Sequence, residues 1–193
     1  TFYMKSSVER IENLNFVEQC DHIQKEISDR LDDHERILLS GAALFKVTEG
    51  KVTREQWHTF TQAQDVDKRL PGIQGIGYSV LSPNESLQRH IETIRLEGFP
   101  KYTVSPEGDR DVYSAIVYLE PFSVRNQRAF GYDMFSEPVR RDALERARDT
   151  GNPALSGKVL LVQEIETDVQ AGNLIYIALY QKGMSIETVE QRR

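Results

Sequence analysis

The chain has 193 residues, enough for one domain or two small ones. Charged residues make up 28% of it and hydrophobic residues 39%, which is typical of a globular protein and excludes a disordered one. The net charge of −6 argues against nucleic acid or an anionic membrane surface as the main partner, because both require a basic face.

Targeting and anchoring signals are not evident in the sequence. No run of about 18 apolar residues could span a bilayer, and the segment Thr1–Arg10 lacks the apolar core of a signal peptide. Because the chain begins with Thr rather than Met, we expect a fragment of a longer protein. Cys20 is the single cysteine, so an internal disulfide is excluded. We expect it to pack as a small apolar residue in a helix, with an intermolecular disulfide as the alternative.

The first expected element is one long helix from Val8 to about Leu39, a stretch without Gly or Pro. Its apolar residues mostly recur every three or four positions: Ile11, Leu14, Phe16, Cys20, Ile23, Ile27, Leu31 and Leu38. About 30 residues span roughly 45 Å, more than a small domain needs to cover. The helix is therefore either a stalk or dimer seam, or an ordinary amphipathic helix on its own core. After Gly41, Ala42–Val47 either continues it or departs from it.

A second helix is expected to begin at Thr53, where Thr53 and Gln56 form a capping box. It should run to about Leu70 and end at Pro71-Gly72. Ile73–Leu81 is then predicted to be a strand. The glycines around it only superficially resemble a phosphate-binding loop, since they precede a strand and open no helix.

The next segments are predicted to be a helix and two strands. Ser82-Pro83-Asn84-Glu85 has the pattern of a helix start. The expected apolar face of that helix is Leu87, Ile91, Ile94 and Leu96, and Gly98 and Pro100 end it. Lys101–Val104 should be a short strand, and Val112–Leu119 a strong one, closed by Glu120-Pro121.

The last third should contain one helix among strands. Phe130–Met134 is predicted to be a short strand, followed by a helix that Ser136 caps and Gly151 ends. Its expected inner face is Val139, Ala143 and Ala147. Ala154–Val162 and Asn173–Tyr180 are predicted strands joined by the loop Glu164–Gly172, and Ile186–Arg193 begins a final helix. The order of elements indicates an α+β fold with an antiparallel sheet and flanking helices.

The sequence gives little sign of catalysis or metal binding. The four histidines lack metal-ligand spacing: His22, His34, His58 and His90. Asp133 and Glu120 are the acids flanked by apolar strand residues, but an Asp at a strand end is more often an acceptor for loop backbone donors. We therefore expect no enzymatic activity and no catalytic residues, no metal and no cofactor.

Arg140 and Arg141 form a basic pair one turn into the expected helix after Ser136. Arg141 is best explained as a solvated charge that balances nearby acids. Arg140 could instead reach back over the sheet edge, where an inward guanidinium would offer a forked donor to a carboxylate or phosphate.

Several short motifs follow one another in a distinctive order along the chain. They are Pro71-Gly72-Ile73-Gln74-Gly75-Ile76-Gly77-Tyr78, Glu97-Gly98-Phe99, Tyr118-x-Glu120-Pro121, Asn126-x-x-Ala129-x-Gly131-Tyr132-Asp133, Arg140-Arg141-x-Ala143-Leu144-x-x-Ala147-Arg148-x-Thr150-Gly151, Leu155-Ser156-Gly157 and the segment Tyr176–Tyr180. In this order and spacing they resemble the CHASE domain family over about Thr53–Arg193. The long helix before them also suits that family.

The resemblance implies an extracytoplasmic sensor between two transmembrane helices of a histidine kinase, diguanylate cyclase or similar receptor. It implies that residues 1–48 form a stalk and dimerisation helix. Residues 49–193 would form a sensor domain with PAS-like antiparallel subdomains. A ligand would bind in the membrane-distal subdomain. We expect a periplasmic portion of a bacterial inner-membrane protein, homodimeric through the long helix, with an incomplete membrane-proximal half. Bacterial members of the family are resembled more closely than plant cytokinin receptors by three sequence segments, PGIQGIGY, GYD and ARDTG.

The same resemblance implies a ligand site. In the cytokinin branch an Asp directly before an Arg contacts the adenine ring, and Arg140 falls at that position here. This reversal of charge favours an anionic or carbonyl-bearing small molecule over adenine. Ser156, Val162 and Tyr176 fall at further contact positions, and Tyr118 and Tyr132 complete the expected lining. The alternative is an interaction or dimerisation module, which a closed, side-chain-filled site would favour over a cavity of a few hundred Å³.

Overall fold

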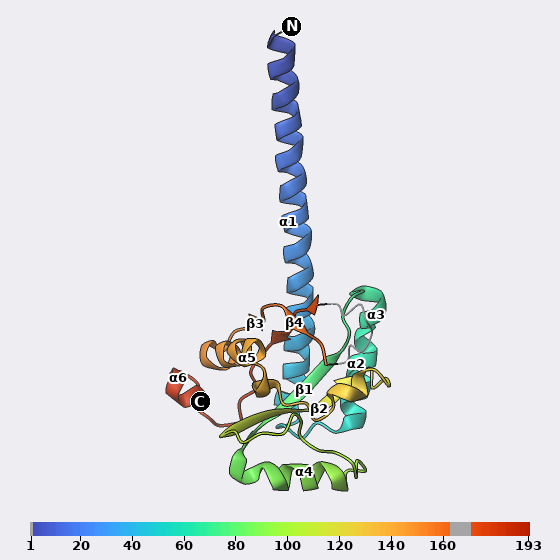
Figure 1. Cartoon of the computed structure of the whole chain (residues 1–193), viewed down its shortest axis with the longest axis vertical. Helices are drawn as coiled ribbons and strands as arrows, with labels where there is room; N and C mark the ends of the chain where they lie inside the picture. Colours follow the sequence, from blue (N-terminus) through green and yellow to red (C-terminus); the bar gives the residue numbers. More distant parts are fainter. Residues whose placement is uncertain (1, 163–170) are drawn as a thin grey trace. The chain divides into compact units, whose positions relative to one another are not determined.

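The computed structural model describes residues 2–162 and 171–193, and the chain divides into two compact units, Thr1–Ile37 and Leu38–Arg193 (Figure 1). Helix α1 (Phe2–Val47) crosses the boundary between them. It continues through Gly41, which is buried against the rings of Trp57 and Phe60. Tertiary packing thus maintains the helix at a residue of low helix propensity.

In the first unit, the expected apolar residues of α1 are exposed. Phe16 is 65% exposed, and Ile11, Leu14, Ile23 and Ile27 are each more than half exposed. Cys20 is also exposed, so the prediction that it packs as a small apolar residue is wrong for this chain. The described part of this unit, residues 2–37, is all helix, and it provides no core on which these side chains could pack.

The predicted second helix is two helices, α2 (Arg54–Gln64) and α3 (Val66–Arg69). The capping box is confirmed, because Thr53 accepts from the N–H of Gln56 and the Gln56 side chain accepts from the N–H of Thr53. Asp65 interrupts the helix in a left-handed conformation with φ of 47°, which Asp tolerates better than most residues.

Strands β1 (Ile76–Pro83) and β2 (Val112–Glu120) form an antiparallel pair. β1 extends through Pro83, so the predicted helix begins later, with a 3-10 turn η1 (Asn84–Ser86) before α4 (Leu87–Leu96). Leu96 was expected on the inner face of that helix, but it lies in the last turn and is 89% exposed.

Both faces of β2 are covered, which explains why its five residues Tyr113–Val117 are all buried. On one face, Ile94 of α4 packs with Tyr113, Ala115 and Val117 of β2. On the other face, Ile116 and Leu119 pack in a second cluster with side chains that follow β2 in the chain. Figure 1 shows α4 running along one side of this strand pair.

A β-bulge interrupts the pairing of the two strands. Tyr78 pairs with Tyr118, but the next residue, Ser79, pairs with Ile116, so Val117 is an extra residue in β2. A bulge of this kind places two successive side chains on the same side and reverses the alternation beyond it. Val117 and Tyr118 accordingly both contact the cluster on the α4 face.

Two predicted short strands do not form. Lys101–Val104 is irregular. Of Phe130–Met134, the first four residues lie between the 3-10 helices η2 (Asn126–Ala129) and η3 (Met134–Ser136), and Met134 begins η3. Within the described residues, isolated bridges join Tyr132 to Ser105, directly after the first region, and Asp133 to Ala115 of β2. Gly131 breaks the extended run with φ of +84°, and a Cβ there would lie 2.1 Å from the carbonyl oxygen of Thr103.

Helix α5 (Pro138–Thr150) ends as predicted at Gly151, in a left-handed conformation with φ of 73°. Its cap is Glu137 rather than Ser136, whose hydroxyl donates to the carbonyl of Asp133 instead. Of the expected inner face, Ala143 and Ala147 are buried and Val139 is partly buried.

The remaining strands are shorter than predicted. β3 (Ala154–Leu155) pairs with β6 (Ile175–Tyr176), and β4 (Val159–Leu160) pairs with β5 (Ala171–Gly172). The rest of the predicted loop Glu164–Gly172, residues 164–170, lies outside the described residues. The final helix α6 (Val189–Arg192) starts three residues later than expected, at a capping box formed by Thr188 and Gln191.

The fold is therefore α+β, a long helix followed by small antiparallel sheets with helices, as the sequence indicates. Among the helices of the described residues, none is both long and apolar enough to cross a membrane.

Candidate functional site

The first turn of α5 brings Arg140 into the protein interior. The carboxylate of Glu137 accepts hydrogen bonds from the N–H groups of Val139 (3.0 Å) and Arg140 (2.9 Å), which fixes the start of the helix. Ala143 and Ala147 lie on the same side of the helix as Arg140, three and seven residues further on. Their small side chains allow close packing, and Arg140 is only 2% exposed.

The guanidinium of Arg140 is enclosed by tyrosine and backbone groups. Its Nη2 donates to the carbonyl of Leu160 at 2.6 Å, and its Cζ lies 4.8 Å from the ring centroid of Tyr132. Its Nε is buried and has no hydrogen-bond partner among the residues that the structure describes. Among the described residues no carboxylate forms an ion pair with it, so this buried charge is incompletely compensated within that part of the chain.

Tyr176, on β6, lies close to the same group. Its hydroxyl is buried and, within residues 2–162 and 171–193, has no hydrogen-bond partner. Burial raises the pKa of Tyr176 far above its usual value, and the nearby charge of Arg140 opposes that rise. Val162, Tyr132 and Tyr176 all pack against one core cluster. The structure thus brings four of the six predicted ligand contacts together.

Ser156 is buried, but its hydroxyl is used locally. Its Oγ accepts from the N–H of Leu174 (2.9 Å) and donates to the carbonyl of Gly157 (2.8 Å). Its backbone N–H also donates to Leu174 O, at 2.7 Å. These bonds link the segment after α5 to the segment before β6, and they occupy the only proton that the hydroxyl can donate.

Tyr118 lies apart from Arg140, because the bulge at Val117 directs its side chain to the opposite face of β2. Its hydroxyl donates to the carbonyl of Val52 at 2.7 Å, and its ring lies 6.3 Å from that of Trp57. It belongs to a second group of residues that sequence reasoning did not identify.

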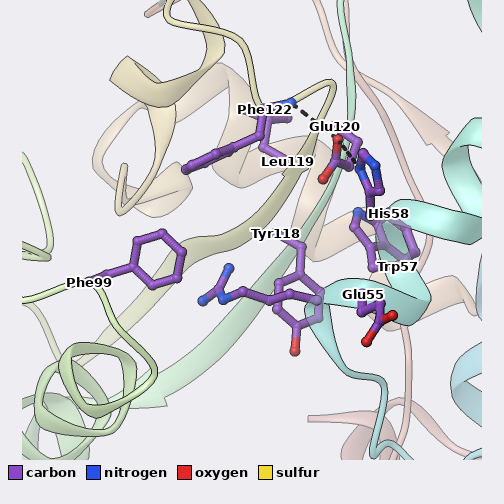
Figure 2. A pocket seen from close by; sticks show the side chains of 9 residues that line it. Glu55, Trp57, His58, Phe99, Tyr118, Leu119, Glu120 and Phe122 are labelled. Atoms are coloured by element: carbon purple, nitrogen blue, oxygen red, sulfur yellow. Dashed lines mark hydrogen bonds and ion pairs between the residues drawn. The ribbon is translucent and has the colours of Figure 1, made fainter.

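That second group surrounds a cleft of about 300 Å³ between α2, the end of β2 and the loop after α4 (Figure 2). Its walls include Arg54, Trp57, Phe99, Tyr118, Glu120 and Phe122. Arg54 donates to the carbonyl of Val117, the extra residue of the bulge, at 2.5 Å. It also forms an ion pair with Glu97 at 2.9 Å. The capping box at Thr53 predicts where α2 starts, but not that its first residue reaches the sheet.

Asp133 is fully buried and acts as a backbone acceptor, as predicted. Its Oδ1 accepts from the N–H groups of Ser114 (2.7 Å) and Phe135 (3.0 Å), and its Oδ2 lies 3.4 Å from Arg110 Nη1. Glu120 is at the far end of β2 and contacts His58 instead, at 3.1 Å. The two acids are therefore not a pair. Arg141, expected to be solvated, is exposed but donates from Nε to the carbonyl of Phe135 at 2.8 Å.

Two further results bear on the class of the protein. Within the described residues, no three His, Cys, Asp or Glu side chains are grouped so that they could hold a metal ion. A family profile described as the CHASE domain matches residues 50–193, which is most of the chain. The match defines the class as the extracellular sensor domains of receptors, which are sensory and not catalytic. The chain belongs to the CHASE domain family. No curated protein matched it.

Proposed function

We propose that this chain senses a small molecule for a bacterial membrane receptor, and that the ligand carries a carboxylate, phosphate or carbonyl group. The observation that carries the proposal is Arg140, a nearly fully buried guanidinium whose Nε has no partner in the described part of the chain. A buried charge is costly unless an anion or several acceptors compensate it. The unpartnered hydroxyl of Tyr176 nearby adds a second donor for the same ligand.

The proposal assigns residues 49–193 to the sensor, with PAS-like subdomains, and residues 1–48 to a stalk. In the full-length receptor the chain would be the periplasmic part of an inner-membrane protein with a kinase or cyclase output. Family membership supports a sensor outside the cytoplasm. Ser156 would act by positioning β3 and β6, since its hydroxyl donates within the chain.

A thermal-shift screen of small carboxylates, sugar phosphates and keto compounds tests this function. A ligand that binds only the folded state raises the melting temperature, by an amount that grows with its concentration above Kd. We expect at least one compound to raise the melting temperature of the wild-type chain and not of Arg140→Lys. Arg89→Lys, at an exposed position of α4, is the control and should respond like the wild type.

The competing function is a module that interacts or dimerises without a small ligand. The cleft lined by Tyr118 does not include Arg140, Ser156 or Tyr176, so it does not supply the cavity expected at the ligand site. If no compound in the screen stabilises the wild-type chain, the interaction module becomes the better explanation.

The same receptor would be a homodimer through α1. Phe16, Cys20, Ile23 and Ile27 follow one another at spacings of three or four and are all exposed. Their spacing forms one apolar stripe along the helix, which a second copy of the same helix would cover in a coiled coil. Ligand binding would then act by its differential affinity for two arrangements of the dimer.

A further inference from the structure

The stripe along α1 repeats every eleven residues. After Ile27 it continues with Leu31, which is 38% exposed, and with His34, which is partly buried. Its members then form three pairs at a separation of eleven residues: Phe16 with Ile27, Cys20 with Leu31, and Ile23 with His34. We call these six residues the seam. An eleven-residue repeat has about 3.67 residues per turn, close to the α-helix itself, so the seam stays on one side of α1.

A seven-residue repeat accounts for the same helix less well. From Phe16 and Ile23 it would continue to Arg30, an exposed residue, and would place its charge in the interface. Burying a charge is costly. The eleven-residue repeat places Leu31 there instead. It also predicts two helices that coil around each other in a right-handed sense, whereas a heptad repeat gives a left-handed coil.

The residues beside the seam favour one direction of the second helix. Arg30 flanks the seam on one side, and Glu35, five residues later, flanks it on the other. In a parallel pair, opposite flanks face each other, so Arg30 of one copy lies beside Glu35 of the other. In an antiparallel pair, like flanks face each other. The positions eleven residues earlier on the two flanks are Gln19 and Gln24, which are uncharged. Charge complementarity therefore favours the parallel pair.

We propose that two copies of α1 associate in parallel and in register through this eleven-residue repeat. The inference rests on the homodimer of the proposed function and adds its geometry, namely which residues meet and in which direction the helices run. Each seam residue then lies opposite the same residue of the second copy. Cys20 faces Cys20 and Leu31 faces Leu31, so thiols at these two positions report on the interface.

Disulfide cross-linking of the whole chain by diamide, without any ligand, tests this geometry. Two thiols each lose a hydrogen atom and form the disulfide, and the diazene takes up both atoms as a hydrazine. Leu31→Cys, Arg30→Cys and Ser28→Cys are each made in a Cys20→Ser background, and Ser28 is an exposed position off the seam. We expect Cys20 and Leu31→Cys to cross-link about tenfold faster than the other two, because the dimer raises the effective concentration of facing thiols.

An antiparallel pair can bring only one residue opposite its own copy. Fast cross-linking of Cys20 with slow cross-linking of Leu31→Cys would therefore overturn the parallel arrangement. Equally fast cross-linking of Arg30→Cys and Leu31→Cys would overturn the eleven-residue repeat.

Charge reversal tests the direction of the helices without thiol chemistry. Arg30→Glu should weaken the dimer about threefold or more in analytical ultracentrifugation, since it places two acids side by side at each flank. Combining it with Glu35→Arg should restore the wild-type affinity, and no recovery in the double variant would overturn the proposal. A dimer whose Cys20 reacts no faster than Ser28→Cys overturns the geometry alone, whereas a monomer overturns the dimer as well. Neither result depends on Arg140, because no ligand is present.

Discussion

Asp133 joins the backbone of β2 to that of η3 through a single carboxylate oxygen. Oδ1 accepts from Ser114 and Phe135, while Oδ2 lies 3.4 Å from the guanidinium of Arg110. Asp133→Asn keeps one acceptor oxygen but turns an uncharged amide N–H₂ toward Arg110. We expect the free energy of unfolding to fall by about 2–4 kcal/mol, measured by urea denaturation.

The matched control is Asp142→Asn, which changes an exposed acid on α5 that pairs with Arg146. It should cost less than about 1 kcal/mol, since surface ion pairs contribute little. Equal effects of the two substitutions would contradict the role given to Asp133.

His90 makes the stability depend on pH. Burial lowers the pKa of His90 below 6.5, with a smaller opposing effect from Glu97, and its Nε2 lies 2.9 Å from the hydroxyl of Tyr102. The unfolded chain takes up a proton near pH 6.5 while the folded chain resists it, so acidification favours unfolding. The difference in unfolding free energy between the wild type and His90→Gln should shrink from about pH 7.5 to about pH 5.5. A constant difference over that range would contradict this account.

At the scale of elements, Arg54 joins α2 to the bulge of β2 and to the end of α4. Arg54→Lys retains the charge but loses the fork that reaches both Val117 O and Glu97, and it weakens the stacking on Phe99. We expect a loss of about 1–3 kcal/mol in unfolding free energy. Arg69→Lys, at an exposed position of α3, should be neutral within about 0.5 kcal/mol. Similar stability of both variants would show that Arg54 does not connect the elements.

Local signals predicted the elements whose causes are local. The capping box at Thr53 and the left-handed Gly151 are both confirmed, because each depends on a few neighbouring residues. β2 was also predicted, since its apolar run is covered on both faces. The predictions of strands at Lys101–Val104 and Phe130–Met134 were wrong. Whether such a segment pairs as a strand depends on distant partners, and the left-handed conformation of Gly131 interrupts the second one.

The residues of the candidate site were likewise only partly predictable from the sequence. Family resemblance led to Arg140, Tyr132, Val162 and Tyr176, which the structure brings together. Tyr118 lies apart from them because the extra residue Val117 reverses the alternation of side chains between the two faces of β2. No residue pattern in β2 predicts that bulge. The ion pair of Arg54 with Glu97 joins residues 43 positions apart, a contact that only the folded chain defines.

At the scale of the molecule, the exposed stripe on α1 predicts a dimer. Ile23→Asp places a charge in that stripe, and burying an Ile contributes about 1.5–3 kcal/mol, so the dimer should weaken about tenfold or more. Analytical ultracentrifugation measures the change. Asn15→Asp, which adds the same charge away from the stripe, is the control. A wild-type chain that stays monomeric, or equal weakening by both variants, would contradict the dimer.

The central claim is that Arg140 binds the ligand of a sensor. The direct measurement is calorimetric titration of a compound selected by its thermal shift into the wild type, Arg140→Lys and Tyr176→Phe. The account predicts that Arg140→Lys weakens binding at least tenfold, about 1.4 kcal/mol, because an ammonium cannot reproduce the forked guanidinium. Tyr176→Phe should weaken it by a smaller factor, through the loss of one hydrogen-bond donor. Wild-type affinity in Arg140→Lys, with the variant folded, would contradict the claim.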